Sequence, residues 1–151
     1  MNQDDFDTEF PNLWSRAYGV GYVVLGDRAE AEDIAQEALA RAFVRWDRVS
    51  GFAGPWVVRV AGNLAIDRVR RSRRSAPAAA SEMAGPNELR VDLQAALVRL
   101  PKRQRECVVL RHLADLPEAE VARVLGCSTG TVKTHTSRGL AALRVAMGVD
   151  T

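Results

Sequence analysis

The segment Gly126–His135, near the C-terminal end, combines residue types whose spacing suits binding to DNA. A glycine such as Gly126 can adopt the left-handed backbone that ends a helix, and Ser128 can accept hydrogen bonds from the free amides of a following helix. Lysine and arginine pair with guanine edges or phosphates, and threonine and serine can bind either. The pattern predicts a helix–turn–helix whose second helix enters a major groove, with candidate DNA contacts at Thr129, Thr131, Lys133, Thr134, His135, Ser137 and Arg138. The alternative is an ordinary helical hairpin with a solvated face.

A second candidate site surrounds Trp56, where aromatic and basic side chains alternate. Aromatic rings stack on unpaired bases while cations follow the phosphate backbone, and an asparagine amide can both donate to and accept from a base edge. The residues Phe52, Trp56, Arg59, Asn63 and Arg68 offer this mixture. Residue chemistry alone supports equally well a core position for the two aromatic side chains, with Asn63 bonded to a helix neighbour.

A third candidate is a polar face on the helix expected after Asp27, made of Asp33, Gln36, Glu37 and Arg41. Such a face could dock on a basic protein surface. Taken alone, it is more simply explained as a solvated helix face.

Charge is strongly segregated along the 151 residues. Residues 1–44 hold nine acidic and three basic residues, whereas residues 45–74 hold two acidic and eight basic ones. Residues 89–151 hold six acidic and ten basic residues. Basic blocks suit phosphate backbones and the acidic block suits a basic protein surface, so the chain is expected to have two kinds of partner.

Several classes of protein are not expected. No stretch approaches the roughly 20 apolar residues of a membrane span, and the acidic start Met1–Asp5 lacks the features of a signal peptide, which predicts a cytoplasmic protein without membrane insertion. The pairs Cys107/His112 and Cys127/His135 do not have zinc-finger spacing. Phosphate-binding loops and hydrolytic triads are not recognisable, so we expect no metal, cofactor or catalytic activity.

The elements that must position these residues are almost all helices. Apolar periodicity predicts a helix over about Phe6–Leu25 and a second one capped by Asp27. Residues 47–54 are predicted to be a loop because they contain two glycines, and Pro55 is predicted to open a third helix that ends near Arg74.

The rest of the chain predicts a linker and a second group of helices. Residues 75–88 are rich in Ala, Ser, Pro and Gly and have no periodic apolar face, so they are expected to be a flexible linker. Four helices are expected after it, over Leu89–Leu100, from Pro101, from Pro117 and over Thr129–Met147. The fold class is therefore all-α, with two small helical domains, 1–74 and 89–151, that need not touch.

Three segments together resemble a known family. Gly26–Ala38, Pro55–Arg71 and Leu100–Glu106, the last followed by Gly130–Lys133 and Arg138, are similar in order to regions 2 and 4 of extracytoplasmic-function (ECF) sigma factors, the short group of the bacterial sigma-70 family. The resemblance implies a non-enzymatic factor that binds RNA polymerase core and promoter DNA. It also implies that region 4 sits on the polymerase flap, that the linker threads toward the active-site channel, and that an anti-sigma protein is a possible partner.

Carried over by position, the resemblance gives each candidate residue a role. Asp33, Gln36, Glu37 and Arg41 would dock on the clamp helices of the polymerase core. An unstacked base of the minus-ten element would be captured by Arg48, Val49, Ser50, Phe52, Trp56, Arg59 and Asn63, and nearby phosphates would be held by Arg68, Arg70 and Arg71. The minus-thirty-five element would be recognised by Lys133, Thr134, His135, Ser137 and Arg138. The sequence departs from the family's common pattern at Gly62, His135 and Gly139.

Two other functions remain to be weighed. A DNA-binding regulator with a response-regulator type of helix–turn–helix would need alternating strands and a phosphoacceptor aspartate in residues 1–74, and neither is apparent. A decoy that binds polymerase core or a regulator, but no promoter, would have the same helices. Promoter-dependent transcription by purified core with this chain separates the three.

Overall fold

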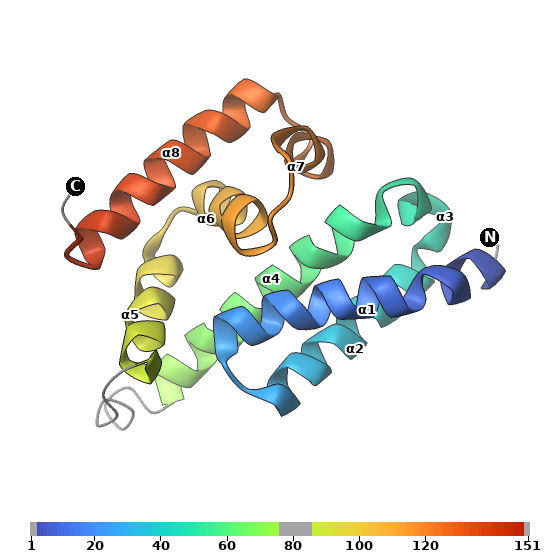
Figure 1. Ribbon diagram of the computed structural model, residues 1–151, viewed down its shortest axis with the longest axis horizontal. Coiled ribbons are helices and arrows are strands. Elements are labelled where there is room, and N and C mark those ends of the chain that lie inside the picture. The colour runs from blue at the N-terminus through green and yellow to red at the C-terminus, as the bar shows by residue number, and fades with distance from the viewer. Residues whose placement is uncertain (1–2, 76–85, 150–151) are drawn as a thin grey trace.

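The structure, a computed structural model, describes residues 3–75 and 86–149, and these residues form helices without any strand. The all-α prediction is therefore confirmed. In Figure 1 the N-terminal helices α1, α2 and α4 pack side by side. Of the C-terminal helices, α6 (Lys102–Val108) and α7 (Glu118–Leu125) lie against α4, and α8 (Thr129–Ala146) packs on α6 and α7. The N-terminal elements are α1 (Gln3–Leu25), α2 (Arg28–Val44), α3 (Trp46–Val49), the 3-10 turn η1 (Ser50–Phe52) and α4 (Ala53–Ser75).

The start of α2 follows the sequence prediction. Asp27 has an extended backbone, and its side chain accepts a hydrogen bond of 2.9 Å from the amide of Glu30. This bond satisfies one of the amides that the first helical turn leaves free. From there α2 presents a buried face rich in alanine, which lets α1 and α4 approach it closely: Ala31, Ile34, Ala35, Ala38, Leu39 and Ala42.

The prediction of a loop over residues 47–54 is wrong. This segment is instead α3 and η1, and α4 begins at Ala53 rather than at Pro55. Trp46 and Val49 are almost fully buried. Their packing in the core stabilises helical turns in a segment whose two glycines favour a loop. Pro55 lies within the first turn of α4, where a missing amide hydrogen leaves no helical bond unmade.

The C-terminal helices also differ from prediction at their ends. They are α5 (Pro86–Arg99), α6 (Lys102–Val108), the π-helical turn η2 (Val109–Leu113), α7 (Glu118–Leu125) and α8 (Thr129–Ala146). The helices extend into both ends of the linker predicted over residues 75–88, because α4 continues through Ser75 and α5 begins at Pro86. Residues 76–85 of that linker lie outside the described residues.

The turn of the helix–turn–helix is as predicted. Gly126 has φ of 71° and ends α7, and Ser128 accepts a hydrogen bond of 3.1 Å from the amide of Thr131 at the start of α8. Because a side chain is disfavoured at positive φ, glycine is the suitable residue at position 126. The π-helical turn η2 was not anticipated from the sequence.

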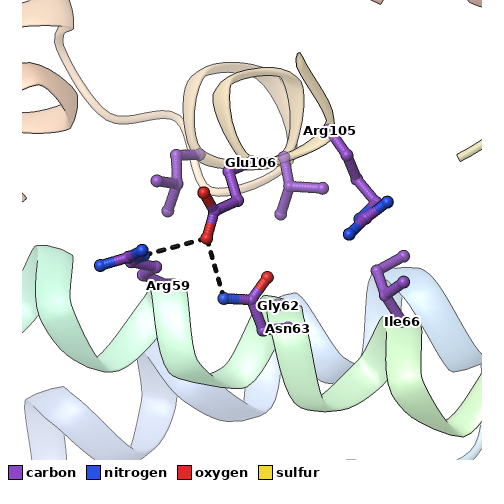
Figure 2. Close-up of a pocket in the computed structure, with 8 residues that line it drawn as sticks. Arg59, Gly62, Asn63, Ile66, Arg105 and Glu106 are labelled. Atoms are coloured by element: carbon purple, nitrogen blue, oxygen red, sulfur yellow. Dashed lines mark hydrogen bonds and ion pairs between the residues drawn. The ribbon is translucent and has the colours of Figure 1, made fainter. Parts of the chain in front are cut away.

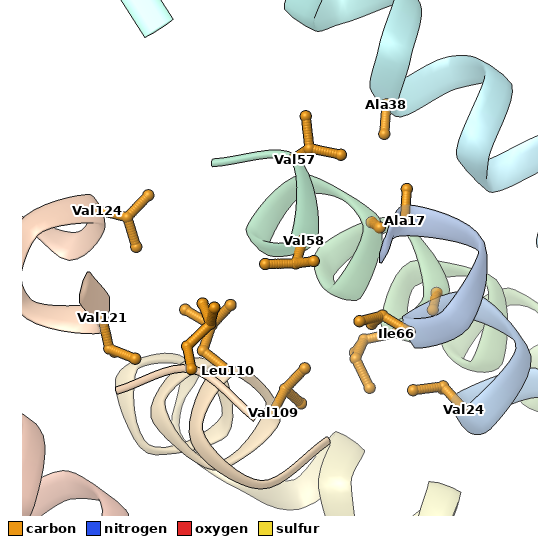
Figure 3. Packing of buried hydrophobic residues seen from close by; sticks show 14 of the residues in the cluster. Ala17, Val24, Ala38, Val57, Val58, Ile66, Val109, Leu110, Val121 and Val124 are labelled. Carbon is orange, nitrogen blue, oxygen red and sulfur yellow. The ribbon is translucent and has the colours of Figure 1, made fainter. Parts of the chain in front are cut away.

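The two halves of the chain, which the sequence did not require to touch, are in contact in this structure. A continuous cluster of buried apolar side chains runs from α1 and α2 through α4 into η2 and α7. Figure 3 shows Val58 and Ile66 of α4 facing Val109, Leu110 and Val121. Removing this apolar surface from water favours the arrangement in which the two halves are in contact, called here the closed form.

Candidate nucleic-acid interface

The exposed face of α8 carries most of the residues predicted to contact duplex DNA. Thr129, Thr131, Lys133, Thr134, Ser137 and Arg138 are all exposed. His135 is half-buried, and its Nδ1 atom has no hydrogen-bond partner. The opposite face of α8 packs on α6 and α7 through buried residues that include Val132 and Leu143. Thus α8 is held rigidly while it presents a polar and basic face to solvent.

A glycine brings α8 unusually close to α6. A Cβ atom on Gly139 would lie 2.6 Å from Val108 Cγ2 and 3.2 Å from the backbone oxygen of Gln104. No side chain fits there without displacing α6. The departure from the common family pattern at Gly139 therefore has a packing reason.

Basic residues beyond the predicted contacts extend the polar face of α8. A groove of about 280 Å³ is lined by side chains that include Arg111, Lys133, Ser137 and Arg144, together with the acidic Glu118. Lys133 Nζ lies 3.9 Å from Glu118 Oε1, an exposed pair of the kind that contributes little to stability. Neither Arg111 nor Arg144 was predicted as a contact: Arg144 lies on α8 beyond the last predicted contact, Arg138, and Arg111 lies on η2, which only tertiary packing brings beside α8.

The second candidate site is a pocket on the N-terminal half. It has a volume of about 310 Å³ and is lined by Arg41, Arg45, Trp56, Arg59, Val60 and Asn63. An aromatic ring beside three guanidinium groups suits an unpaired base and its phosphates. Arg45, at the junction of α2 and α3, was missed from sequence because no spacing rule connects it to Trp56. Arg41 was predicted to dock on protein, yet it lies in this pocket.

The remaining residues predicted for minus-ten DNA are not all gathered there. The side chain of Val49 is buried in the core of the free chain and is not presented at the surface, so its assignment to DNA stays a prediction. Arg48 and Ser50 are exposed, with Arg48 lining a separate hollow beside Val44. Phe52 is half-buried, and the guanidinium carbon of Arg123 lies 5.3 Å from the centre of its ring.

The arginines near the end of α4 differ in their surroundings. Arg68 is paired with the acidic face of α2, 3.7 Å from Glu30 and 3.8 Å from Asp33. Arg70 lies 3.7 Å from Asp67, and Arg71 is exposed. A phosphate that approaches Arg68 would have to compete with two carboxylates, so the predicted phosphate contact needs those pairs to open.

The predicted docking residues share one exposed face of α2. Asp33, Gln36 and Glu37 point away from the buried alanine face, and Glu37 pairs with Arg41 one turn later. A partner protein could therefore contact this face without disturbing the core.

Glu106 joins the two halves of the chain and was not predicted as a functional residue. Its Oε2 atom accepts hydrogen bonds of 3.0 Å from both Arg59 Nε and Asn63 Nδ2, as Figure 2 shows. Its side chain is only 2% exposed. Burial by itself would raise the pKa of Glu106, but the hydrogen bonds from Asn63 and Arg59 and the positive charges of Arg59 and Arg103 outweigh burial and hold that pKa below its usual value.

The space around Glu106 is too small to bind a ligand. Arg59, Gly62, Asn63, Glu106 and Val109 help to enclose a cavity of about 10 Å³, which is barely the size of one water molecule. The cavity is part of the contact between α4 and the C-terminal helices.

The two halves of the chain each match a region of one known protein family. The model of Sigma-70 region 2 matches residues 7–75, and that of Sigma-70 region 4 matches residues 90–143. The ECF RNA polymerase sigma factor SigW of Bacillus subtilis is 32% identical over 95% of this chain and 89% of its own length. The chain is an ECF sigma factor of the sigma-70 family.

Further comparisons agree with this assignment. RNA polymerase sigma-E factor of Streptomyces coelicolor is 35% identical over 78% of this chain and 72% of its own length. The sigma factor RpoE from Bartonella quintana, solved in complex with the anti-sigma factor NepR, shares the fold with a TM-score of 0.63 at 22% identity, over 97% of this chain and 99% of that chain. As a member of this non-catalytic family, the chain initiates transcription by RNA polymerase at specific promoters, and the alternative of a response-regulator type of protein is set aside.

The described residues provide neither a metal-binding cluster nor a membrane-spanning helix. Over 3–75 and 86–149, His, Cys, Asp and Glu do not gather in threes that could hold a metal ion. Within those same ranges, none of the helices is both long enough and apolar enough to traverse a lipid bilayer.

Proposed function

We propose that this sigma factor uses three surfaces: the exposed face of α2, the exposed face of α8, and the pocket around Trp56. The pocket would trap melted minus-ten DNA. The observation that carries the proposal is the joint placement of Trp56, Arg41, Arg45 and Arg59 around one open pocket. Stacking on Trp56 and pairing of phosphates with the guanidinium groups favour a single strand over an intact duplex, whose bases are already stacked. The pocket therefore binds the open promoter more tightly than the closed one, which shifts the melting equilibrium.

Region 4 would first position the factor on duplex DNA. The exposed side chains of α8, above all Lys133, Thr134 and Arg138, suit the major groove of the minus-thirty-five element. Arg111 and Arg144 extend the basic surface along the adjacent phosphates. Phosphate contacts of this kind place the factor without selecting sequence, so base recognition falls to α8.

The exposed face of α2 would hold the polymerase core. Asp33, Gln36 and Glu37 offer a polar, acidic surface to the clamp helices, and region 4 would contact the flap. The functional units would be residues 1–74 and 89–151, acting in the cytoplasm with polymerase. Since RpoE of Bartonella quintana was solved with an anti-sigma factor, an anti-sigma protein is a further possible partner of this chain.

The test compares two DNA probes of one sequence. Purified chain and polymerase core are mixed with a promoter selected for binding by that holoenzyme, either as intact duplex or with the minus-ten segment held open by mismatches. Tighter binding to the open probe, lost on Trp56→Ala, supports the proposal. Equal affinity for the two probes contradicts it. Promoter-dependent transcription in the same mixture shows whether binding of the open probe accompanies RNA synthesis.

A further inference from the structure

Two residues of the proposed DNA-binding side of α4 are already bonded to region 4. Arg59 and Asn63 both line the pocket around Trp56, and both donate to the same carboxylate oxygen of Glu106. That oxygen presents to them the charge and acceptor geometry that a phosphate or a base edge would present. A strand that uses Arg59 and Asn63 must therefore displace Glu106.

Other contacts from region 4 reach the same stretch of α4 and η1. Arg59 Nη1 lies 3.5 Å from the backbone oxygen of Val124, and Arg123 covers the ring of Phe52. Thus Phe52, Arg59 and Asn63, three residues assigned to melted DNA, each have a partner on α6 or α7. Figure 2 shows the α6 segment lying directly over α4 at Arg59, Gly62 and Asn63.

Glycine at position 62 permits this close contact. A Cβ atom on Gly62 would lie 3.0 Å from Val109 Cγ1, tighter than ordinary van der Waals contact. On either side of this point Val58 and Ile66 pack against the apolar side chains of η2 and α7 (Figure 3). The apolar contact supplies stability, and the Glu106 hydrogen bonds fix the alignment of the two halves.

We propose that this contact is self-inhibitory: in the free chain, Glu106 occupies Arg59 and Asn63, and region 4 must leave α4 before the factor can trap melted DNA. The proposal rests on the proposed function of α4. Closed and DNA-bound forms are mutually exclusive, so every increment of stability in the closed form lowers the apparent affinity for a melted strand. Polymerase core would favour opening by binding the two halves apart.

A disulfide across the contact tests the proposal directly. The Gly62 Cβ to Val109 Cγ1 distance places the two Cβ atoms no more than about 4.5 Å apart, within the range for a disulfide. We would introduce Gly62→Cys and Val109→Cys into a chain in which Cys107→Ala and Cys127→Ser remove the native thiols. The oxidised and reduced chains are then each mixed with polymerase core and the mismatch-opened probe, after circular dichroism has verified helix content. Gly62→Cys alone, in the same background, controls for the oxidant.

The expected result is at least about tenfold weaker binding by the oxidised chain, restored by reduction. Equal binding by the two forms overturns the self-inhibition. If the reduced chain with core shows no preference for the open probe over duplex, the proposed function itself fails, so the two failures are distinguishable.

A second measurement avoids the new cysteines. Glu106→Gln keeps the shape of the side chain but removes the charge that both donors share, and Glu120→Gln makes the same change in net charge at an exposed position of α7. In small-angle scattering of the free chain, Glu106→Gln should increase the radius of gyration and Glu120→Gln should not. Unchanged dimensions for Glu106→Gln would show that Glu106 does not hold the closed form.

Gly62→Leu provides an independent way to separate the halves. Its larger side chain cannot fit against Val109, whereas the same change at Gly19, which has no atom within 4 Å of an added Cβ, controls for the altered helix propensity. Expansion of Gly62→Leu but not of Gly19→Leu supports the proposal. The same dimensions for both variants would contradict it.

Discussion

Asn63 donates a hydrogen bond of 3.0 Å to Glu106, although 43 positions separate the two residues in the sequence. Asn63 lies on α4, the helix of region 2 that resembles a promoter-melting segment, and Glu106 lies on α6 in region 4. The contact connects the two halves of the sigma factor at a residue expected to bind DNA. Whether the two halves are in contact in the free chain therefore bears on how readily Asn63 can bind DNA.

Replacing Trp56 with alanine should impair trapping of the melted strand. Loss of one base–aromatic stack weakens binding by about 1–3 kcal/mol, while duplex binding through α8 should be spared. Permanganate footprinting of unpaired thymines would report fewer open complexes. Phe10→Ala, which removes a partly exposed ring from α1, is the matched control; equal footprints for Trp56→Ala and the unmodified chain would exclude Trp56 from the site.

Replacing Arg138 with alanine should weaken binding to the minus-thirty-five duplex. The cost is about 1–3 kcal/mol if the guanidinium contacts a base, with relaxed preference at that base. Fluorescence anisotropy of holoenzyme on duplex probes of varied sequence measures both effects. Arg99→Ala removes an exposed arginine from α5 and should have no effect. Unchanged binding by Arg138→Ala would remove Arg138 from the interface.

Reversing charge on α2 should abolish binding to polymerase core. Asp33→Arg with Glu37→Arg places positive charge on the proposed docking face, and it also breaks the exposed pairs of these residues with Arg68 and Arg41, which contribute little to stability. Co-elution with core in size-exclusion chromatography is the measurement. Asp7→Arg with Glu9→Arg makes the same charge change on exposed positions of α1. Co-elution of the α2 variant with core would refute the docking face.

Removing the cap of α2 should reduce stability. Asp27→Ala deletes the acceptor for the Glu30 amide and should lower the free energy of unfolding by about 1 kcal/mol in urea titrations. Asp27→Asn retains an acceptor and should be close to neutral. A similar loss in both variants would show that the capping bond is not the source of the effect.

The two cysteines should differ in reactivity. Burial raises the pKa of the Cys107 thiol to about 11, with the nearby Cys127 and Glu106 as lesser causes. Alkylation near pH 8 should therefore modify Cys127, which is partly exposed, well before Cys107. Mass spectrometry of partly alkylated protein would identify the order. Rapid modification of Cys107 in the folded chain would contradict its burial.

The same pKa predicts how stability varies at high pH. The folded state keeps Cys107 neutral, whereas the unfolded state releases its proton above a pKa near 9. The unfolded state therefore binds fewer protons between about pH 9 and 11, so this thiol makes stability fall as pH rises through that window. Urea titrations of the unmodified chain and Cys107→Ala should diverge there. Parallel pH profiles would contradict the shift.

Local helical structure and family membership could both be predicted from the sequence. Helical periodicity, the Asp27 and Ser128 caps and the glycine at 126 are consequences of neighbouring residues, so α2 and the turn before α8 could be predicted from them. The exposed face of α8 followed from the same periodicity. Local patterns failed where burial overrode composition, as at Trp46 and Val49, which convert an expected loop into helical turns.

Which distant side chains meet depends on the way the helices pack. Arg45 joins Trp56, Arg111 joins α8, and Glu106 joins Arg59 and Asn63 because apolar helix faces pack there. Such contacts depend on the positions of whole helices, and at Gly62 an added Cβ would already lie only 3.0 Å from Val109 Cγ1. A sequence pattern of three or four residues carries no information at that range, so the contact between the two halves could be found only in the folded chain.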